Sequence, residues 1–165
     1  MVHLVGDVHQ PLHSVALFNE TYPHGDIGGN KQNVTLLNGS KSVLHAFWDA
    51  GGYRIQNDSW KIVRPMNLQN LTALKDVARG MIDQYGDEVE ELGKVIDPTV
   101  WVQESFLIAQ NTTYPHIIKT DILDEEYTNT AYELSRKRIT LAGYRLAHYV
   151  VELYKEEHRK GNLMR

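Results

Sequence analysis

Residues 3–13 read HLVGDVHQPLH, and this stretch decides how the rest of the chain is interpreted. It places three of the eight histidines, His3, His9 and His13, around Asp7. His3 and Asp7 are four residues apart, so on a helix both side chains lie on one face, about one turn apart. His9 is only two residues from Asp7 and should face away from it. We therefore expect His9 to be a structural residue or an indirect support of a ligand.

The spacing of His3 and Asp7 recurs in His45 and Asp49. A single pair of this kind is usually a hydrogen-bonded pair at a helix surface. Both pairs, however, stand beside apolar residues, and a buried aspartate is costly unless it is paired or binds a metal. His13 can point from a turn toward either pair. Imidazole and carboxylate ligands together suit zinc, so the spacing indicates either a zinc site or two ordinary polar pairs.

Length and composition narrow the class of protein. The chain has 165 residues, which is enough for one domain with a core. Its formal net charge of −4 gives no basic surface for non-specific nucleic-acid binding. The lack of cysteine excludes disulfides and cysteine-based zinc sites. No apolar run approaches the roughly 20 residues of a membrane span, so we expect no membrane partner.

The chain is rich in N-x-[ST] sequons, the acceptor sites for N-glycosylation. This density indicates a secreted or lumenal glycoprotein, although Asn and Thr also gather in surface loops. The sequons begin at Asn19, Asn33, Asn38, Asn57, Asn70 and Asn111.

Periodicity predicts a mainly α-helical chain with one small β-hairpin insertion. The hairpin is predicted around Asn38-Gly39, between two short β-prone runs. We expect apolar residues from Leu71 to Ile82, and from Tyr127 to Leu153, to form core faces of two long helices. The predicted helices cover residues 2–18 with an interruption near Pro11, 44–52, 70–93, a stretch beginning at Asp97-Pro98, and about 124 to about 159.

Several motifs together resemble the S1/P1 nuclease family of zinc-dependent nucleases. They are GDVHQPLH, GDIGGN, NVTL and LHAFWD, followed by WVQES at 101–105, EY at 126–127 and AGYRLAHYV at 142–150. The resemblance runs from residue 3 to about residue 150. It implies a phospholipase C/P1 nuclease-like helical fold, and we expect residues 1–165 to form a single domain of this kind.

The resemblance also implies roles for the candidate ligands. The family has a cluster of three zinc ions. The residue matching His3 binds one ion of a close pair, and the residue matching Asp7 bridges that pair, which makes these two the candidate catalytic residues. The residues matching His13, His45 and Asp49 bind the third ion.

For the substrate, the resemblance implies that Asn30, together with Gly29 of the same GGN motif, lies in a nucleobase pocket. The implied reaction is phosphodiester hydrolysis of single-stranded DNA or RNA, leaving 5′-phosphates. Removal of 3′-phosphates from nucleotides is a further implied activity. We expect a monomer.

The chain departs from the family pattern at its start. The family's N-terminal region supplies an N-terminal Trp and further ligands that these residues do not match. We therefore expect an N-terminally truncated, C-terminal portion of the fold with one complete zinc site, and with exposed apolar surface near the first helix. Two alternatives stay open, a zinc phospholipase C-like phosphodiesterase and an inactive fragment that retains one zinc site.

Overall fold

The computed structural model describes residues 2–55 and 65–163, and the Asn57 sequon lies outside these residues. Helices and one two-stranded antiparallel sheet make up the fold, which confirms the predicted mainly α architecture with a small hairpin. In chain order the elements are α1 (Val2–Asp7), the 3-10 helix η1 (Pro11–Ser14), β1 (Asn33–Thr35), β2 (Lys41–Val43), α2 (Leu44–Asp49), α3 (Leu68–Gly93), α4 (Pro98–Ile108), the π-helical turn η3 (Ala109–Thr113), α5 (Tyr114–Ile117) and α6 (Glu125–Leu163).

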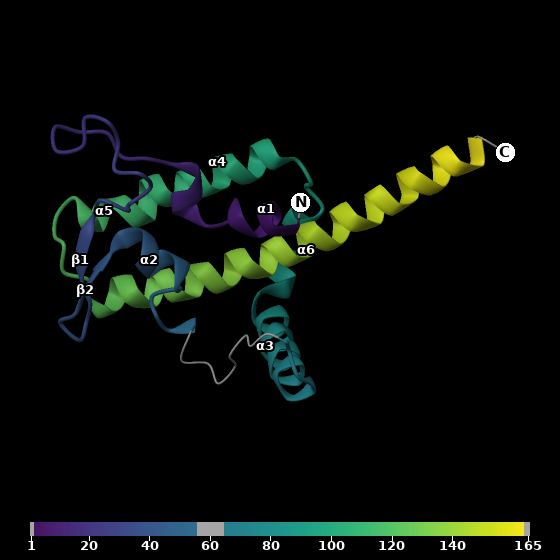
Figure 1. The fold of residues 1–165 in the computed structure, drawn as a ribbon, viewed down its shortest axis with the longest axis horizontal. Helices are drawn as coiled ribbons and strands as arrows, with labels where there is room; N and C mark the ends of the chain where they lie inside the picture. Colours follow the sequence, from purple (N-terminus) through teal and green to yellow (C-terminus); the bar gives the residue numbers. More distant parts are fainter. Residues whose placement is uncertain (1, 56–64, 164–165) are drawn as a thin grey trace.

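Helix α6 is the element against which the others are arranged (Figure 1). In this view α1 lies between α4 and α6, and α3 packs against α6 from another side. The last turns of α6 extend past the other helices. Within the described residues, no helix combines the length and the apolarity needed to span a membrane.

The core forms where α2 meets α6. Phe47 and Trp48 of α2 are almost fully buried, and Phe47 stacks on Tyr127 of α6 with ring centroids 5.9 Å apart. The Trp48 Nε1–H donates to the Tyr127 hydroxyl at 3.0 Å, which in turn donates to the carbonyl of Thr113 at 2.8 Å. This chain of two buried hydrogen bonds ties α2, α6 and η3 together.

The N-terminal segment is less helical than predicted. Helix α1 ends at Asp7, a separate 3-10 turn covers Pro11–Ser14, and residues 15–18 are irregular. Pro11 has no N–H to continue the ladder, and the Gln10 side chain caps the new turn by accepting from Leu12 N–H. The Leu17 N–H donates to the carboxylate of Asp26, so a loop contact takes the place of a helical bond.

Two of the predicted core faces are also shorter than expected. Ile82 of α3 is 48% exposed, because the buried face of this helix passes through Met81, Tyr85 and Val89 instead. Leu153 is 45% exposed, because α6 extends there beyond the helices that cover it. Near the first helix, Leu4 is 59% exposed, in agreement with the expected exposed apolar surface.

The hydrogen bonds of Tyr127 generate a stability prediction. Tyr127→Phe should lower the free energy of unfolding by about 1–3 kcal/mol, because the buried indole N–H of Trp48 and the carbonyl of Thr113 both lose their partner. Urea denaturation measures the change. Tyr154→Phe is the matched control, since that ring is 63% exposed and should leave stability unchanged. Equal losses in the two variants would contradict the role given to the buried hydroxyl.

Candidate metal centre

Helix α2 presents two polar side chains because its other face is anchored in the core. Leu44, Phe47 and Trp48 are buried, so the remaining positions of this short helix face outward. His45 and Asp49 occupy that outer face one turn apart, and the His45 Nε2 lies 3.4 Å from Asp49 Oδ2. The predicted pairing of these two residues is therefore present in the structure.

His13 reaches the same place from the 3-10 turn. Its neighbour Leu12 is buried in the core, which fixes the direction in which the turn projects the imidazole. The His13 Nδ1 lies 3.0 Å from the Asp7 carbonyl oxygen and 2.9 Å from the Asp7 carboxylate. Both partners are acceptors, which favours a hydrogen on Nδ1, and Nε2 is directed the other way, to within 3.1 Å of Asp49 Oδ1.

The imidazole of His45 is oriented by the glycine-rich loop. Its Nδ1 donates to the carbonyl of Gly28 at 2.8 Å. Gly28 has φ +56°, and a Cβ there would lie 2.4 Å from the Leu12 carbonyl oxygen, so the close approach of the two segments requires glycine. The loop is anchored by the fully buried Asp26, whose carboxylate accepts from the hydroxyl of Tyr114 at 2.9 Å.

These contacts bring His13, His45 and Asp49 together. Each offers one ligand atom, and the three atoms lie within 4.8 Å of one another. The two imidazole rings stack with centroids 5.0 Å apart and an interplanar angle of 20°. Ligand atoms around one tetrahedral ion are about 3.3 Å apart, because the bonds to zinc are about 2.0–2.1 Å long. Small side-chain adjustments would therefore let this group hold a metal ion.

The orientation of the two rings suits a cation at this point. Nδ1 of His13 and of His45 each lies against a backbone carbonyl, so Nε2 is the nitrogen that each ring directs at Asp49. A cation between these two nitrogens and the carboxylate would be attracted to all three groups. The three candidate ligands have side chains 22%, 21% and 46% exposed, which would leave room for a further ligand, as in catalytic rather than structural zinc sites.

The structure places the other two predicted ligands beside this group. Asp7 contacts His13 and is 39% exposed, whereas the His3 side chain is 86% exposed with its Nε2 3.9 Å from the Asp7 carboxylate. His3 and Asp7 thus share a helix face as their spacing predicts. Their roles as ligands stay predictions, because the group of three described above contains neither.

One polar contact of this site was not expected from the sequence. The Gln10 side-chain amide donates to Asp49 Oδ1 at 2.8 Å and so helps to orient the carboxylate, whose Oδ2 faces His45. The sequence Gln10-Pro11 does indicate a capping role, because the side chain before a turn that begins with proline often caps that turn, as Gln10 does. The long-range contact with α2 carried no local signal.

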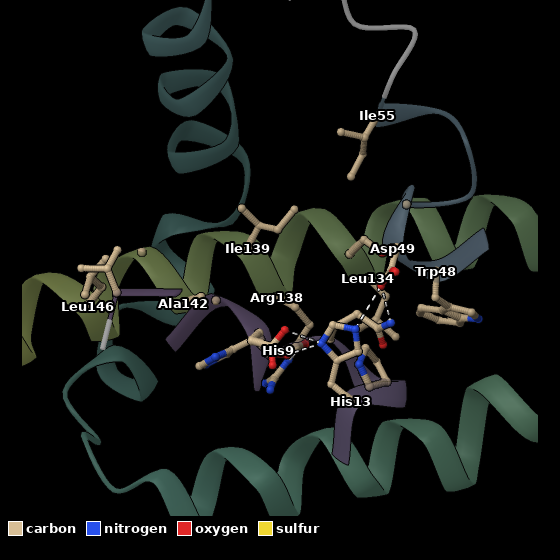
Figure 2. A pocket seen from close by; sticks show the side chains of 18 residues that line it. His9, His13, Trp48, Asp49, Ile55, Leu134, Arg138, Ile139, Ala142 and Leu146 are labelled. Atoms are coloured by element: carbon tan, nitrogen blue, oxygen red, sulfur yellow. Dashed lines mark hydrogen bonds and ion pairs between the residues drawn. The ribbon is translucent and has the colours of Figure 1, made fainter. Parts of the chain in front are cut away.

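Two concavities meet at the candidate ligands. One is a groove of about 450 Å³ beside α6, and Figure 2 shows His13 and Asp49 at one end of it and Leu146 at the other. The second lies across His13 and His45 and is lined by the glycine-rich loop, including Asn30. Asn30 is exposed, its amide donating to the carbonyl of Ile27 at 2.9 Å, whereas Gly29 is buried.

His9 lies away from this group, as its spacing predicts. It is 2% exposed, and its Nδ1 donates to the carbonyl of Val5 at 2.6 Å. Burial, and then the positive charge of Arg138, lower the pKa of His9 from its ordinary value of 6.5 to about 4. The ring is therefore neutral at physiological pH.

Comparison with known proteins gives the family. The model of the S1/P1 nuclease family matches residues 1–155 of this chain. The match covers both helices that carry candidate ligands, the 3-10 turn and the glycine-rich loop. The chain belongs to the S1/P1 nuclease family, which confirms the resemblance drawn from its motifs.

Individual relatives agree with this assignment. Nuclease PA3 of Penicillium sp and nuclease P1 of Penicillium citrinum are each 30% identical to the chain over 170 residues, with 95% of this chain and 57% of the relative covered. Endonuclease 1 of Arabidopsis thaliana is 28% identical over 159 residues, covering 94% of this chain and 48% of the relative. The chain spans about half the length of the curated relatives it matches.

The packing around Gly28 yields a prediction for the site. Gly28→Ala should weaken divalent metal binding and lower the melting temperature, because the new Cβ would displace the loop whose carbonyl orients His45. Gly39→Ala is the matched control. It also has a positive φ, of +80°, but a Cβ there meets nothing within 4 Å. Isothermal titration with Zn²⁺ measures the difference, and equal affinities in the two variants would contradict it.

Proposed function

We propose that this member of the S1/P1 nuclease family is a zinc-dependent nuclease that hydrolyses phosphodiester bonds of single-stranded DNA or RNA. The observation that carries the proposal is the convergence of two imidazole Nε2 atoms on the carboxylate of Asp49, inside a chain of this family. His13, His45 and Asp49 would hold one zinc ion. The names of the relatives, nucleases and endonucleases, support the reaction class.

When bound, zinc supplies a Lewis acid that lowers the pKa of water and neutralises charge on a phosphate. The residues of the chain have supporting tasks. The carbonyls of Asp7 and Gly28 fix the ring orientations of His13 and His45, and hydrogen bonds of this kind also raise the basicity of the ligands. Gln10 orients the carboxylate of Asp49 by donating a hydrogen bond to its Oδ1.

We assign His3 and Asp7 to a second part of the centre. Asp7 lies against His13 and is partly exposed, so its carboxylate can reach a neighbouring ion without leaving the group. His3, one turn earlier, is 3.9 Å from Asp7 and free to rotate toward the same ion. These two residues would serve a close pair of ions that is separate from the ion at His13, His45 and Asp49. Such a pair would activate water and stabilise the leaving oxygen, which is the basis for naming His3 and Asp7 as catalytic residues.

The substrate is proposed from the second concavity. Asn30 and Gly29 belong to the loop that also orients His45, so a base held at this loop would place its phosphate at the candidate ligands. A single strand fits because its bases are accessible to such a pocket, whereas those of a duplex are stacked and paired. The proposed products carry 5′-phosphates, and 3′-nucleotides are proposed as further substrates.

We also propose a secreted or lumenal glycoprotein. Asn19, Asn33 and Asn38 are exposed on the loop and hairpin, where a glycan can be attached. The Asn111 sequon differs, because its Thr113 is fully buried. Deglycosylation of the secreted protein followed by mass spectrometry would identify the modified sites.

Zinc stoichiometry tests the metal assignment. The purified chain should contain about one zinc, measured by inductively coupled plasma mass spectrometry, and His45→Ala should contain much less. Zinc should raise the melting temperature of the wild type but not of the variant, because a metal that binds only the folded state stabilises it. His24→Ala is the control, since this exposed histidine is outside the group. Unchanged zinc in His45→Ala, or three ions per chain, would contradict the assignment.

Substrate assays test the reaction. With zinc present, the protein should release acid-soluble nucleotides with 5′-phosphates from single-stranded DNA faster than from duplex DNA. Release of phosphocholine from lecithin would instead support a phospholipase C-like reaction. About one zinc per chain without either activity would identify a zinc-binding domain that does not catalyse the reaction by itself.

A further inference from the structure

A buried ionic network lies directly behind the candidate metal centre. Arg145 is fully buried, and its guanidinium donates two hydrogen bonds of 2.7 Å to the two carboxylate oxygens of Glu104. Arg138, also buried, donates a third to Glu104 at 2.7 Å. Burial raises the pKa of Glu104, but the two arginines outweigh it and the net pKa is lowered. The Glu104 carboxylate, which belongs to α4, is therefore ionised. Both arginines that bind it belong to α6.

The network forms hydrogen bonds to the turn that separates Asp7 from His13. Arg138 Nε donates to the carbonyl of His9 at 3.2 Å. The hydroxyl of Ser105, which accepts from Arg138 Nη2 at 2.9 Å, donates to the carbonyl of Val8 at 2.6 Å. Two successive carbonyls of a turn outside any helix are thus fixed by side chains from α4 and α6.

The ring of His9 is the third contact between the network and the turn. Its Nδ1–H donates to the carbonyl of Val5, at the end of α1, and its Nε2 accepts from Arg145 Nη1 at 2.8 Å. The Trp101 ring lies 5.4 Å from the imidazole, and the Arg145 guanidinium lies over the same indole. His9 therefore bridges α1 to α6 with both nitrogens engaged.

Stability alone does not account for this arrangement. Removing charges from water is expensive, and a buried group of arginines and a glutamate is often no more stable than apolar residues of the same size. Hydrogen-bonded ion pairs do provide a defined geometry, because each donor holds one acceptor at a fixed distance and angle. Here the fixed acceptors are the backbone groups between two candidate ligands. The motifs WVQES and AGYRLAHYV, which supply none of the candidate ligands, supply Glu104, Ser105 and Arg145.

We infer that Glu104, Arg138, Arg145 and His9 are positioning residues of the metal centre, which hold the turn so that Asp7 and His13 meet α2 at the distances a metal requires. The inference rests on the proposed function, because it assumes that the group of three binds a metal. None of the four is among the candidate ligands. They act through the main chain of residues 8–9, which connects directly to Asp7 and, two residues later, to the turn carrying His13.

Co²⁺ binding provides a test that does not depend on catalysis. Glu104→Gln keeps the shape of the side chain but removes the charge that holds both arginines, and should weaken Co²⁺ binding about 10- to 100-fold. Glu88→Gln is the matched control, because Glu88 also pairs with α6, through Lys137, but does not contact the turn. It should bind Co²⁺ as the wild type does. Visible absorption of bound Co²⁺ reports both affinity and ligand geometry.

A second pair of variants separates positioning from general stability. His9→Gln can still present an acceptor to Arg145, so it should recover most of the Co²⁺ affinity and the absorption spectrum that His9→Ala loses. If Glu104→Gln does not fold like the wild type, as judged by its circular dichroism spectrum, the two His9 variants test the positioning role instead. Wild-type Co²⁺ affinity and spectrum in Glu104→Gln, or in His9→Ala, would overturn the inference. Failure of the wild type itself to bind Co²⁺ would overturn the proposed function first.

Discussion

Two hydrogen bonds from imidazole nitrogens to backbone carbonyls determine what this site can do. Because Nδ1 of His13 and of His45 each donates to a carbonyl, the two Nε2 atoms are the ones presented to Asp49. A tautomer change at either ring would turn the Nε2 lone pair into a donor and make a hydrogen-bonded surface cluster instead of a ligand set. The chemistry therefore depends on where two carbonyl oxygens are held, more than on the histidines themselves.

Those carbonyls are held by buried polar groups, each distant in sequence. The carbonyl of Gly28 belongs to a loop anchored through Asp26 to Tyr114, 88 residues away. The carbonyl of Asp7 precedes a turn whose next residues are fixed by Ser105 and Arg138. The core contact between α2 and α6 then sets the position of Asp49 relative to both. Three separate sets of contacts thus position the candidate ligands. A change in any one of them should alter the distances among His13, His45 and Asp49.

The sequence predicted the local part of this arrangement and missed the rest. The spacing of His45 and Asp49 sufficed to pair them, because helical periodicity is a local property, and the Asn-Gly signal sufficed for the hairpin. The family motifs brought His13 to the same group. The burial of Arg145 could not be predicted from local sequence, because an arginine is seldom fully buried and its partner Glu104 is 41 residues away. Helix periodicity also overestimated residues 15–18, where a contact with Asp26 prevails.

Charge explains why a metal is needed for the proposed substrate. The chain carries a formal net charge of −4, and its candidate site contains two of the negative groups, the partly exposed carboxylates of Asp7 and Asp49. A phosphodiester approaching two carboxylates is repelled, and the arginines nearest to them, Arg138 and Arg145, are already neutralised in part by Glu104 and directed at the main chain. A divalent ion between the imidazoles and Asp49 would offset the charge of the two carboxylates and give the phosphate a positive centre to bind. The acidic character of the chain, which argues against a basic nucleic-acid groove, thus favours a nuclease that binds its substrate through metal.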